Sequence, residues 1–261
     1  MAAFRALQFN MQFGQVWDHH DPDHARIDLD LSIAEIRAQN ADIVFLQEVE
    51  QARPGGEQLD PPPNYTRLRS KLDDYDSFFS YPKVDPQELP FGIGLCILSR
   101  TPLRDRVRVD LPSPTIEFEF KGERKVPTDR LLIGASTTVA GHEMRVFNTH
   151  LLAFFMLKAS SDQHTGQRRR VLGELSTSSA PTLLGGDFNV SRHETLLREF
   201  SHAGYRTVQS TEITWRRQPF VLDHLFYNEH LRPVRHVVKA TPASDHHMII
   251  ADFEFVPDPR A

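Results

Sequence analysis

The sequence has a single cysteine, no long apolar run and no leader pattern of a secreted protein. Cys96 excludes a disulfide within the chain, and it lies in an apolar run that is typical of a buried side chain. No run approaches the roughly 20 apolar residues of a membrane span. The N-terminus lacks the basic and then apolar pattern of a signal peptide. If Met1 is the native start, we therefore expect a cytoplasmic protein.

Positive charge is also scarce. The chain has 30 Lys and Arg against 35 Asp and Glu, which gives a net charge of −5. A protein that holds nucleic acid by phosphate contacts alone usually has a basic surface. The balance disfavours such a protein, but a local basic patch or bound cations could still serve nucleic-acid binding.

Several common catalytic motifs are absent. The sequence contains no HExxH, no pair of cysteines, no P-loop and no Gly-x-Ser-x-Gly. Zinc proteases and P-loop nucleotide hydrolases are therefore excluded, and the absence of Gly-x-Ser-x-Gly argues against a serine α/β-hydrolase. The histidine-rich residues 18–24 could bind a metal, but a solvated polar loop is the favoured interpretation.

The length of 261 residues fits one domain, which we place at residues 1–257, with a short tail at 258–261. Hydrophobic periodicity predicts a strand at 4–10, an amphipathic helix at 25–39 and a strand at 42–49, followed by a loop at 53–64. Strand, helix and strand at this spacing indicate a layered α/β arrangement.

The rest of the chain alternates short strands with turns and two further helices. Ser160 and Gln163 have the spacing of a capping box and predict a helix at 162–175. A second helix is expected at 193–203. The expected strands are 77–81, 94–99, 107–111, 116–120, 131–139, 144–149, 181–184, 222–227, 234–239 and 248–255.

Residues 183–190 read Leu-Leu-Gly-Gly-Asp-Phe-Asn-Val and are the most informative stretch. Asp187 and Asn189 are two residues apart, so on extended backbone they point to the same side. A carboxylate and an amide at the end of a strand can hold water, a metal or a phosphate oxygen. A simple turn is the alternative, because Gly, Asp and Asn are common turn residues.

Polar side chains stand at the ends of six apolar segments. They are Asn10; Glu48; Asn148 and His150; Asp187 and Asn189; Asp223; and Asp245 with His246. Binding residues of α/β folds collect at one edge of the sheet, so we expect one site. Its oxygen ligands suit a hard cation such as Mg²⁺, and its carboxylates and histidines suit a water nucleophile that attacks a phosphate.

In these motifs the chain resembles the endonuclease/exonuclease/phosphatase superfamily, which includes deoxyribonuclease I, apurinic endonucleases, neutral sphingomyelinases and inositol polyphosphate 5-phosphatases. Each motif is weak alone, but the ordered set spans nearly the whole chain and is specific. It comprises Phe9-Asn10, Leu46-Gln47-Glu48, residues 94–100, Asn148-Thr149-His150-Leu151, Gly186-Asp187-Phe188-Asn189, Leu222-Asp223-His224 and Ser244-Asp245-His246. The resemblance implies a four-layer α/β/β/α sandwich of two mixed β-sheets flanked by helices.

The resemblance also implies a role for each residue. Glu48 would be the principal Mg²⁺ ligand, with Asn10 and Asp245 as further metal ligands and Mn²⁺ as a possible substitute. Asp187 would orient or deprotonate the attacking water. The remaining roles would be phosphate binding by Asn189 and Asn148, a phosphate-facing histidine at His150, and a transition-state or leaving-group histidine at His246 held by Asp223. A structural hydrogen-bonding role is the open alternative for Asn148.

Some features depart from the family pattern or need no function. No proline follows residues 244–246, and His150 stands where apurinic endonucleases have a tyrosine, which disfavours abasic-site repair. His224 and His247 are expected to pack or lie on the surface. Residues 168–170, all arginine, are expected to form a solvated helix face.

The substrate stays open because the superfamily carries different specificities on one scaffold. The apolar residues 151–157 either contact a lipid or apolar substrate or cap the core, and capping is favoured. We expect a monomeric, Mg²⁺-dependent phosphodiesterase acting on a small or lipid phosphodiester. The alternatives are a DNA or RNA nuclease and a non-catalytic binding protein on the same fold.

Overall fold

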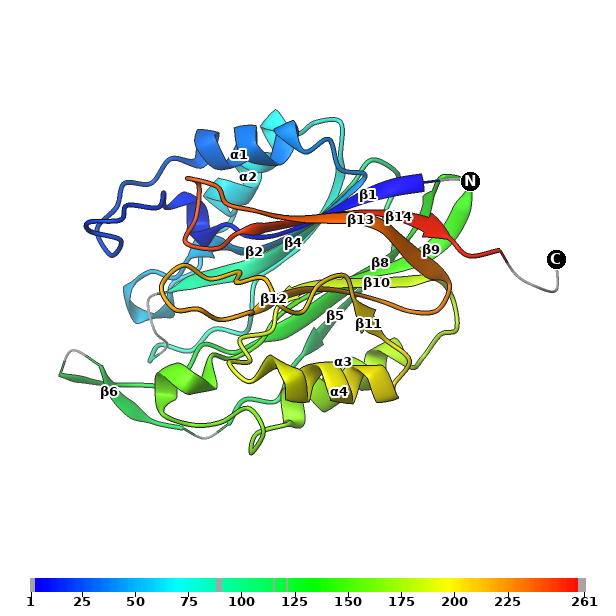
Figure 1. Cartoon of the computed structure of the whole chain (residues 1–261). Coiled ribbons are helices and arrows are strands. Elements are labelled where there is room, and N and C mark those ends of the chain that lie inside the picture. Colours follow the sequence, from blue (N-terminus) through cyan, green and yellow to red (C-terminus); the bar gives the residue numbers. More distant parts are fainter. Residues whose placement is uncertain (1–2, 88–90, 115, 121, 258–261) are drawn as a thin grey trace.

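The computed structural model describes residues 3–87, 91–114, 116–120 and 122–257. Within them, two six-stranded β-sheets face each other. The helices α1 (Leu29–Ala38) and α2 (Pro63–Lys71) cover the outer face of the first sheet, and α3 (Gly166–Leu175) and α4 (His193–His202) cover that of the second (Figure 1). The predicted four-layer sandwich of two mixed sheets is confirmed, while the predicted tail at 258–261 lies outside the described residues.

The first sheet joins both halves of the chain. Its strand order is β13 (Leu231–Lys239), β14 (Met248–Phe255), β1 (Ala3–Asn10), β2 (Ile43–Gln51), β4 (Gly92–Ser99) and β3 (Asp76–Ser80). The pair β1 and β2 is parallel and the other described pairs are antiparallel, so the sheet is mixed.

The second sheet has the same design. Its order is β11 (Arg206–Thr207), β12 (Asp223–Tyr227), β10 (Thr182–Asp187), β9 (His142–His150), β8 (Leu131–Val139) and β5 (Arg104–Asp110). Here β9 and β10 form the parallel pair. A separate hairpin of β6 (Phe118–Phe120) and β7 (Glu123–Lys125) projects from the body at the left of Figure 1. Three short 3₁₀ turns lie in loops: η1 (Gln12–Gly14), η2 (Pro54–Gly56) and η3 (Phe154–Leu157).

Alternation along β1 decides where its polar residues point. Phe4 and Ala6 lie in the core between the two sheets, whereas Leu7 and Phe9 lie in the core under α1 and α2. Because successive side chains of a strand point to opposite faces, Asn10 continues the face of Phe4 and Ala6. Asn10 therefore lies between the sheets, at one end of the sandwich.

The strands β9 and β10 repeat this arrangement from the opposite sheet. Val146 of β9 and Leu183 of β10 belong to the core between the sheets. His150 and Asp187 lie an even number of residues further on, so they continue the same face. The parallel register places Asp187 beside His150. Asn10, His150 and Asp187 thus form the polar end of the core between the two sheets.

One glycine of the motif at 183–190 has a packing role. A Cβ at Gly185 would lie 2.5 Å from the ring of Phe45 on the facing sheet. Real Cβ atoms do not approach other atoms so closely, so a side chain at position 185 would push the sheets apart. The close approach that glycine allows holds the two strand ends near each other.

Two helix boundaries differ from the sequence-based prediction. The helix expected at 25–39 begins only at Leu29, because the Asp28 side chain accepts a hydrogen bond from Leu31 N and caps the helix. The helix expected at 162–175 begins at Gly166. Ser160 Oγ accepts from Asp162 N in a preceding turn, so the predicted capping box is wrong.

The helix α2 was not predicted, because the prolines before it favoured a loop at 53–64. Its N-terminus is completed from outside the helix: the carboxylate of Glu50 on β2 accepts a hydrogen bond from Tyr65 N. A negative charge at a helix N-terminus is favourable there. Burial raises the pKa of Glu50 to about 7.

Candidate active site

The polar strand ends that the sequence singled out meet in one place, between the two sheets. Asn10 Nδ2 donates to Glu48 Oε1 and to Asp187 Oδ2, at 3.0 Å each. These residues come from β1, β2 and β10, so one amide joins carboxylates of both sheets. The Asn10 side chain is fixed in turn, because its Oδ1 accepts from Gln12 N. Three oxygen-bearing side chains are therefore held at one point.

Glu48 reaches this point through an irregular backbone. The register of β2 and β4 shifts between Gln47 and Glu50, and Glu48 has a φ of 51°, which is rare for a residue with a side chain. An ideal Cβ at Gly92 would lie 2.1 Å from Glu48 Oε2, so the carboxylate occupies space that only glycine leaves open. Burial raises the pKa of Glu48, while the Asn10 hydrogen bond opposes that rise.

His246 forms a buried pair with Asp223. Its Nδ1 lies 2.8 Å from Asp223 Oδ2, and its Nε2 lies 3.7 Å from Asp187 Oδ2. Burial alone would lower the pKa of His246, but the Asp223 and Asp187 carboxylates raise it to about 10. Burial and the nearby Asp223 charge raise the pKa of Asp187 to about 7. His246 is thus a cation that faces the Asp187 carboxylate.

Two sets of residues have the geometry to hold a metal. Ligand atoms of Asp187, Asp223 and His246 lie within 4.8 Å of one another. A protonated imidazole between two carboxylates offers no lone pair, so this set suits proton transfer better. Glu48 and Asn10 offer side-chain oxygens next to each other, and the space left by Gly92 seats the Glu48 carboxylate. This set fits a hard divalent cation.

N–H donors also gather next to Asp187, whose Oδ2 lies 3.6 Å from His150 Nε2. His150 Nε2 lies 2.9 Å from Asn189 Nδ2, and its Nδ1 lies 3.2 Å from Arg130 Nη1. The Asn189 amide is oriented, because its Nδ2 also donates to Leu151 O at 3.0 Å. Burial, and then the charges of Arg130 and His246, hold the pKa of His150 well below its ordinary value. Sequence reasoning missed Arg130, which belongs to none of the motifs.

Asp245 is engaged by a loop that the sequence did not connect with the site. Its Oδ2 accepts from Trp215 Nε1 at 3.2 Å and from Arg217 Nε at 2.6 Å. Arg217 Nη1 also contacts Asp23 Oδ1 at 2.5 Å, so the histidine-rich residues 18–24 are tied to the site. A metal contact by Asp245, as predicted, would have to use its other oxygen.

Asn148 lies below the site and not at its opening. Its Nδ2 donates to Leu46 O and Cys96 O at 2.8 and 2.9 Å, and its Oδ1 accepts from Gln47 Nε2 at 2.6 Å. Gln47 bonds Gln8. Both ends of the fully buried amide are therefore committed to protein partners. These contacts favour the structural alternative over substrate binding.

Other residues singled out in the sequence lie outside the site. His224 is fully buried and packs against the Phe188 and Phe226 rings on the outer face of the second sheet, which agrees with a packing role. The prediction for Arg168 is wrong. Its side chain is buried and forms ion pairs with Asp162 and Glu199, because it faces α4 and not solvent.

The apolar stretch 151–157 mostly caps the core. Phe154 is buried and stacks on His164. Phe155 is only half-buried and contacts the rings of Trp215 and Phe220, while the following Met156 is 55% exposed. The stretch thus ends in an aromatic cluster next to Asp245, whose Oδ2 the Trp215 indole contacts.

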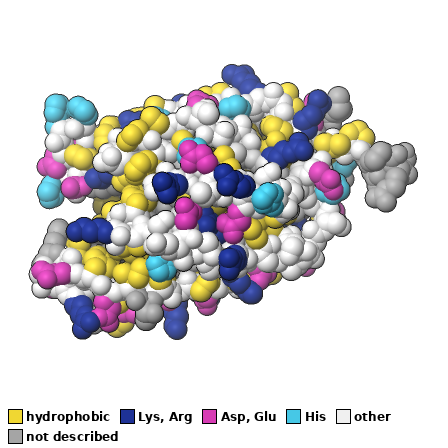
Figure 2. All heavy atoms as spheres, turned by 60° about the horizontal axis from the view of Figure 1, so that its bottom comes forward, with side chains coloured by type: hydrophobic (Ala, Val, Ile, Leu, Met, Phe, Trp, Pro, Cys, Tyr) yellow, Lys and Arg dark blue, Asp and Glu magenta, His cyan; other side chains and the backbone are white. Residues whose placement is uncertain are grey.

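Figure 2 shows hydrophobic side chains gathered at the left of the molecule, between two projecting parts, one of which carries a group of histidines.

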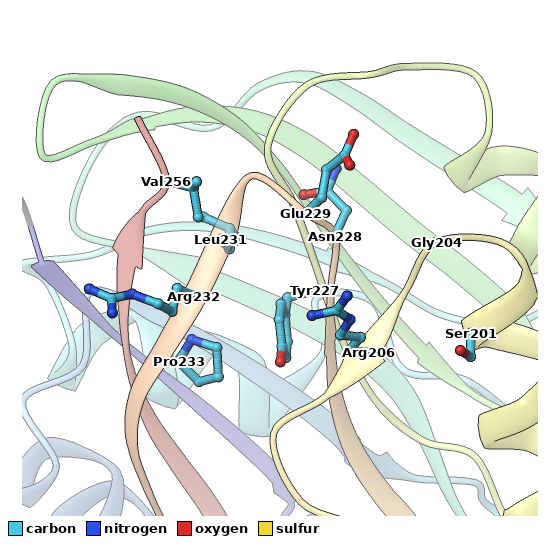
Figure 3. Close-up of a pocket in the computed structure, with 10 residues that line it drawn as sticks. All are labelled: Ser201, Gly204, Arg206, Tyr227, Asn228, Glu229, Leu231, Arg232, Pro233 and Val256. Atoms are coloured by element: carbon cyan, nitrogen blue, oxygen red, sulfur yellow. The ribbon is translucent and has the colours of Figure 1, made fainter. Parts of the chain in front are cut away.

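A separate cavity of about 440 Å³ lies at the other end of β12. Its lining includes Arg206, Tyr227 and Arg232 (Figure 3). Tyr227 is four residues from Asp223 along the strand, roughly 13 Å away, so this cavity is not part of the site.

Similar solved structures share the fold. The endonuclease/exonuclease/phosphatase from Beutenbergia cavernae DSM 12333 is 20% identical with a TM-score of 0.75, and the alignment covers 100% of this chain and 74% of that one. The human Nocturnin catalytic domain with bound sulfate anion is 19% identical, with a TM-score of 0.66 and coverage of 97% and 95%. D. rerio TDP2 complexed with single-strand DNA product is 17% identical, with a TM-score of 0.65 and coverage of 97% and 100%.

No curated protein matches the chain. Among the described residues, no helix is long and apolar enough to cross a membrane. The sequence profile of the Endonuclease/Exonuclease/phosphatase family matches residues 7–246, a range that contains every predicted site residue. The chain therefore belongs to the Endonuclease/Exonuclease/phosphatase family and is a metal-dependent phosphoester hydrolase.

Proposed function

We propose that the protein is a Mg²⁺-dependent phosphodiesterase that cleaves a P–O bond by in-line attack of water. The observation that carries this proposal is the Asn10 amide, which joins the Glu48 and Asp187 carboxylates at 3.0 Å each, next to the His246–Asp223 pair. Oxygen ligands, a base and a cationic acid thus meet in one place. Mn²⁺, which also prefers oxygen ligands, is the expected substitute for Mg²⁺.

Glu48 and Asn10 would hold the cation, which when bound withdraws negative charge from the phosphate. Asp187 is the base in this proposal. Its Oδ1 accepts a hydrogen bond from Asn189 N at 3.0 Å, so the carboxylate is held in a fixed orientation. A base with a pKa near 7 removes a proton from water at neutral pH and can return it.

His246 is the acid of the same reaction. The Asp223 carboxylate keeps its imidazole protonated, and the Nε2 proton points to the region of Asp187. A cation there stabilises the charge that develops on the phosphate and on the leaving oxygen. Asn189 and His150 supply N–H groups for a non-bridging phosphate oxygen.

Small or lipid phosphodiesters are the preferred substrate class. The net charge of −5 disfavours a long polyanion. Binding of a lipid substrate is less favoured, because residues 151–154 are buried and only Phe155, Met156 and Leu157 of the apolar stretch are partly or fully exposed.

A nuclease is the second candidate. The aromatic cluster of Phe155, Trp215 and Phe220 lies beside the site and could stack a base. D. rerio TDP2 carries single-strand DNA product on the same fold, and the Nocturnin domain carries a sulfate anion. Both support a phosphate site, but neither chain is close enough in sequence to assign a substrate.

The test compares three substrates with Mg²⁺ and with EDTA: bis(p-nitrophenyl) phosphate, sphingomyelin vesicles and supercoiled plasmid. Hydrolysis of the small diester with Mg²⁺ alone is the expected result. Nicking of plasmid as the fastest reaction would move the protein to the nucleases. No hydrolysis of any of the three, with Mg²⁺ or Mn²⁺, would contradict the proposal.

A further inference from the structure

Both ring nitrogens of His150 face hydrogen-bond donors, and the carboxylate oxygen Asp187 Oδ2 lies 3.6 Å from Nε2, beyond hydrogen-bond distance. Its Nε2 faces the Asn189 amide nitrogen at 2.9 Å, and its Nδ1 faces the Arg130 guanidinium at 3.2 Å. Both neighbours are donors: a guanidinium has no acceptor, and the Asn189 orientation is fixed by its bond to Leu151 O.

A neutral imidazole has one N–H and one acceptor nitrogen, and a charged one has two N–H groups. In each state at least one ring N–H of His150 points at another donor. This holds whatever the protonation of His150. The mismatch is costly at a site where His150 is 4% exposed, because a buried donor without an acceptor loses its solvation.

The chemistry that resolves the mismatch is an oxyanion, which accepts several hydrogen bonds at once. We propose that Arg130 is a third phosphate-binding side chain and acts with His150 and Asn189 on one non-bridging oxygen of the substrate phosphate. This inference rests on the proposed function, since it assumes a phosphoester at the site, and adds a permanent cation to it.

The position of Arg130 fits the role. It directly precedes β8, and β8 pairs with β9 so that Leu132 lies opposite Thr149. Its carbonyl accepts from Leu111 N at 2.9 Å, which anchors its backbone beside the end of β5. Arg130 also ends the segment 112–130, which carries the projecting β6–β7 hairpin.

Charge is divided across the site in a way that suits a phosphate. Glu48 and Asn10 offer oxygens to a cation, and Arg130, His150 and Asn189 present N–H groups next to Asp187, whose Oδ2 lies 3.6 Å from His150 Nε2. A divalent cation fits the first group and a phosphate oxygen the second. An Arg guanidinium is well suited there, because it keeps its charge and offers several N–H groups in one plane.

The test is calorimetric titration of inorganic phosphate into the wild type and into Arg130→Gln, Arg130→Lys and Arg232→Gln, with and without Mg²⁺. Arg232 is the matched control, because its side chain is 60% exposed and lies beside Glu254, at the end of β14 away from the site. We expect Arg130→Gln to weaken phosphate binding about tenfold or more, which is the loss of one hydrogen bond to a charged group. The phosphate affinity of Arg130→Lys should lie between those of the wild type and Arg130→Gln. The affinity of Arg232→Gln should match that of the wild type.

A second measurement needs no variant. In the wild type, added phosphate should shift the NMR signals of the Arg130 side-chain N–H and of the His150 ring. No shift of the Arg130 signal, binding by Arg130→Gln within twofold of the wild type, or an equal loss in Arg232→Gln would each overturn the proposal.

Hydrolysis of bis(p-nitrophenyl) phosphate, measured in parallel, separates this inference from the proposed function. Phosphate binding that needs Arg130, without hydrolysis by the wild type, would support the inference and contradict the function. Hydrolysis by the wild type, with an unchanged kcat/KM in Arg130→Gln, would support the function and contradict the inference.

Discussion

Gly92 lies so close to Glu48 that an ideal Cβ at position 92 would be 2.1 Å from Oε2 and 2.4 Å from the Glu48 Cβ. The two residues are on the neighbouring strands β2 and β4, where the register shifts. Glu48 also holds a φ of 51°. The glycine and the irregular strand together seat the carboxylate next to Asn10.

The first prediction follows from this contact. Gly92→Ala should displace the Glu48 carboxylate and weaken Mg²⁺ binding by about 10–100-fold, as loss of a residue that orients a ligand does. Calorimetric Mg²⁺ titration measures it, with Gly173→Ala as the control, because Gly173, like Gly92, has no positive φ and nothing lies within 4 Å of a Cβ there. Unchanged Mg²⁺ binding in Gly92→Ala would show that Glu48 is not the ligand.

The second prediction concerns pH. The Asp223 and Asp187 carboxylates raise the pKa of His246 to about 10, and the protonated form is the active acid. Activity should therefore persist to alkaline pH and fall as pH rises through about 10. Asp223→Asn removes one carboxylate, so the alkaline limb of the kcat/KM profile should move to lower pH. An alkaline limb that stays in place would exclude His246 as the acid.

The third prediction separates two asparagines. Asn148→Ala leaves buried partners unsatisfied, at a cost of about 1–3 kcal/mol for each group. Its melting temperature should fall while kcat of the surviving folded protein changes little. Asn189→Ala should show a larger loss of kcat/KM. Thermal denaturation and kinetics on both variants check this, and the opposite assignment would restore Asn148 as a substrate-binding residue.

The fourth prediction concerns Arg217, which bonds Asp245 and Asp23. Arg217→Gln removes the hydrogen bond to the buried Asp245, worth about 1.5–3 kcal/mol, and the pair with the exposed Asp23, worth about 0–1 kcal/mol, and so frees residues 18–24 from the site. Those residues should become more sensitive to limited proteolysis. Arg26→Gln is the matched control, since its partner Asp28 lies outside the site. Equal cleavage of the two variants would mean that Arg217 does not anchor the segment.

The layers of the fold could be predicted because strand alternation and the order of the motifs are local properties of the sequence. Asn10, His150 and Asp187 were found for the same reason, since each ends an apolar strand. The helix α2 was missed because its capping group, Glu50, comes from a strand and not from the sequence before the helix.

The contacts at the site that the sequence did not predict also join segments that lie far apart in the chain. Asn148 continues the correct face of β9, but its partners are main-chain carbonyls of the opposite sheet, which no spacing reveals. Arg130 and Arg217 reach the site through loops, where side-chain direction follows no period. Sequence patterns therefore predict which residues lie at the strand ends. The neighbours of each side chain depend on contacts between distant segments, which the patterns do not show.

The central claim is that Asp187 acts as the base for an attacking water in a Mg²⁺-dependent phosphodiesterase. The most direct test is kcat for bis(p-nitrophenyl) phosphate with saturating Mg²⁺, measured for the wild type, Asp187→Asn and the control Asp110→Asn, whose carboxylate is 54% exposed beside Arg108. We predict a loss of about 10²–10⁴-fold in Asp187→Asn and wild-type activity in Asp110→Asn. Wild-type hydrolysis by Asp187→Asn would contradict the account.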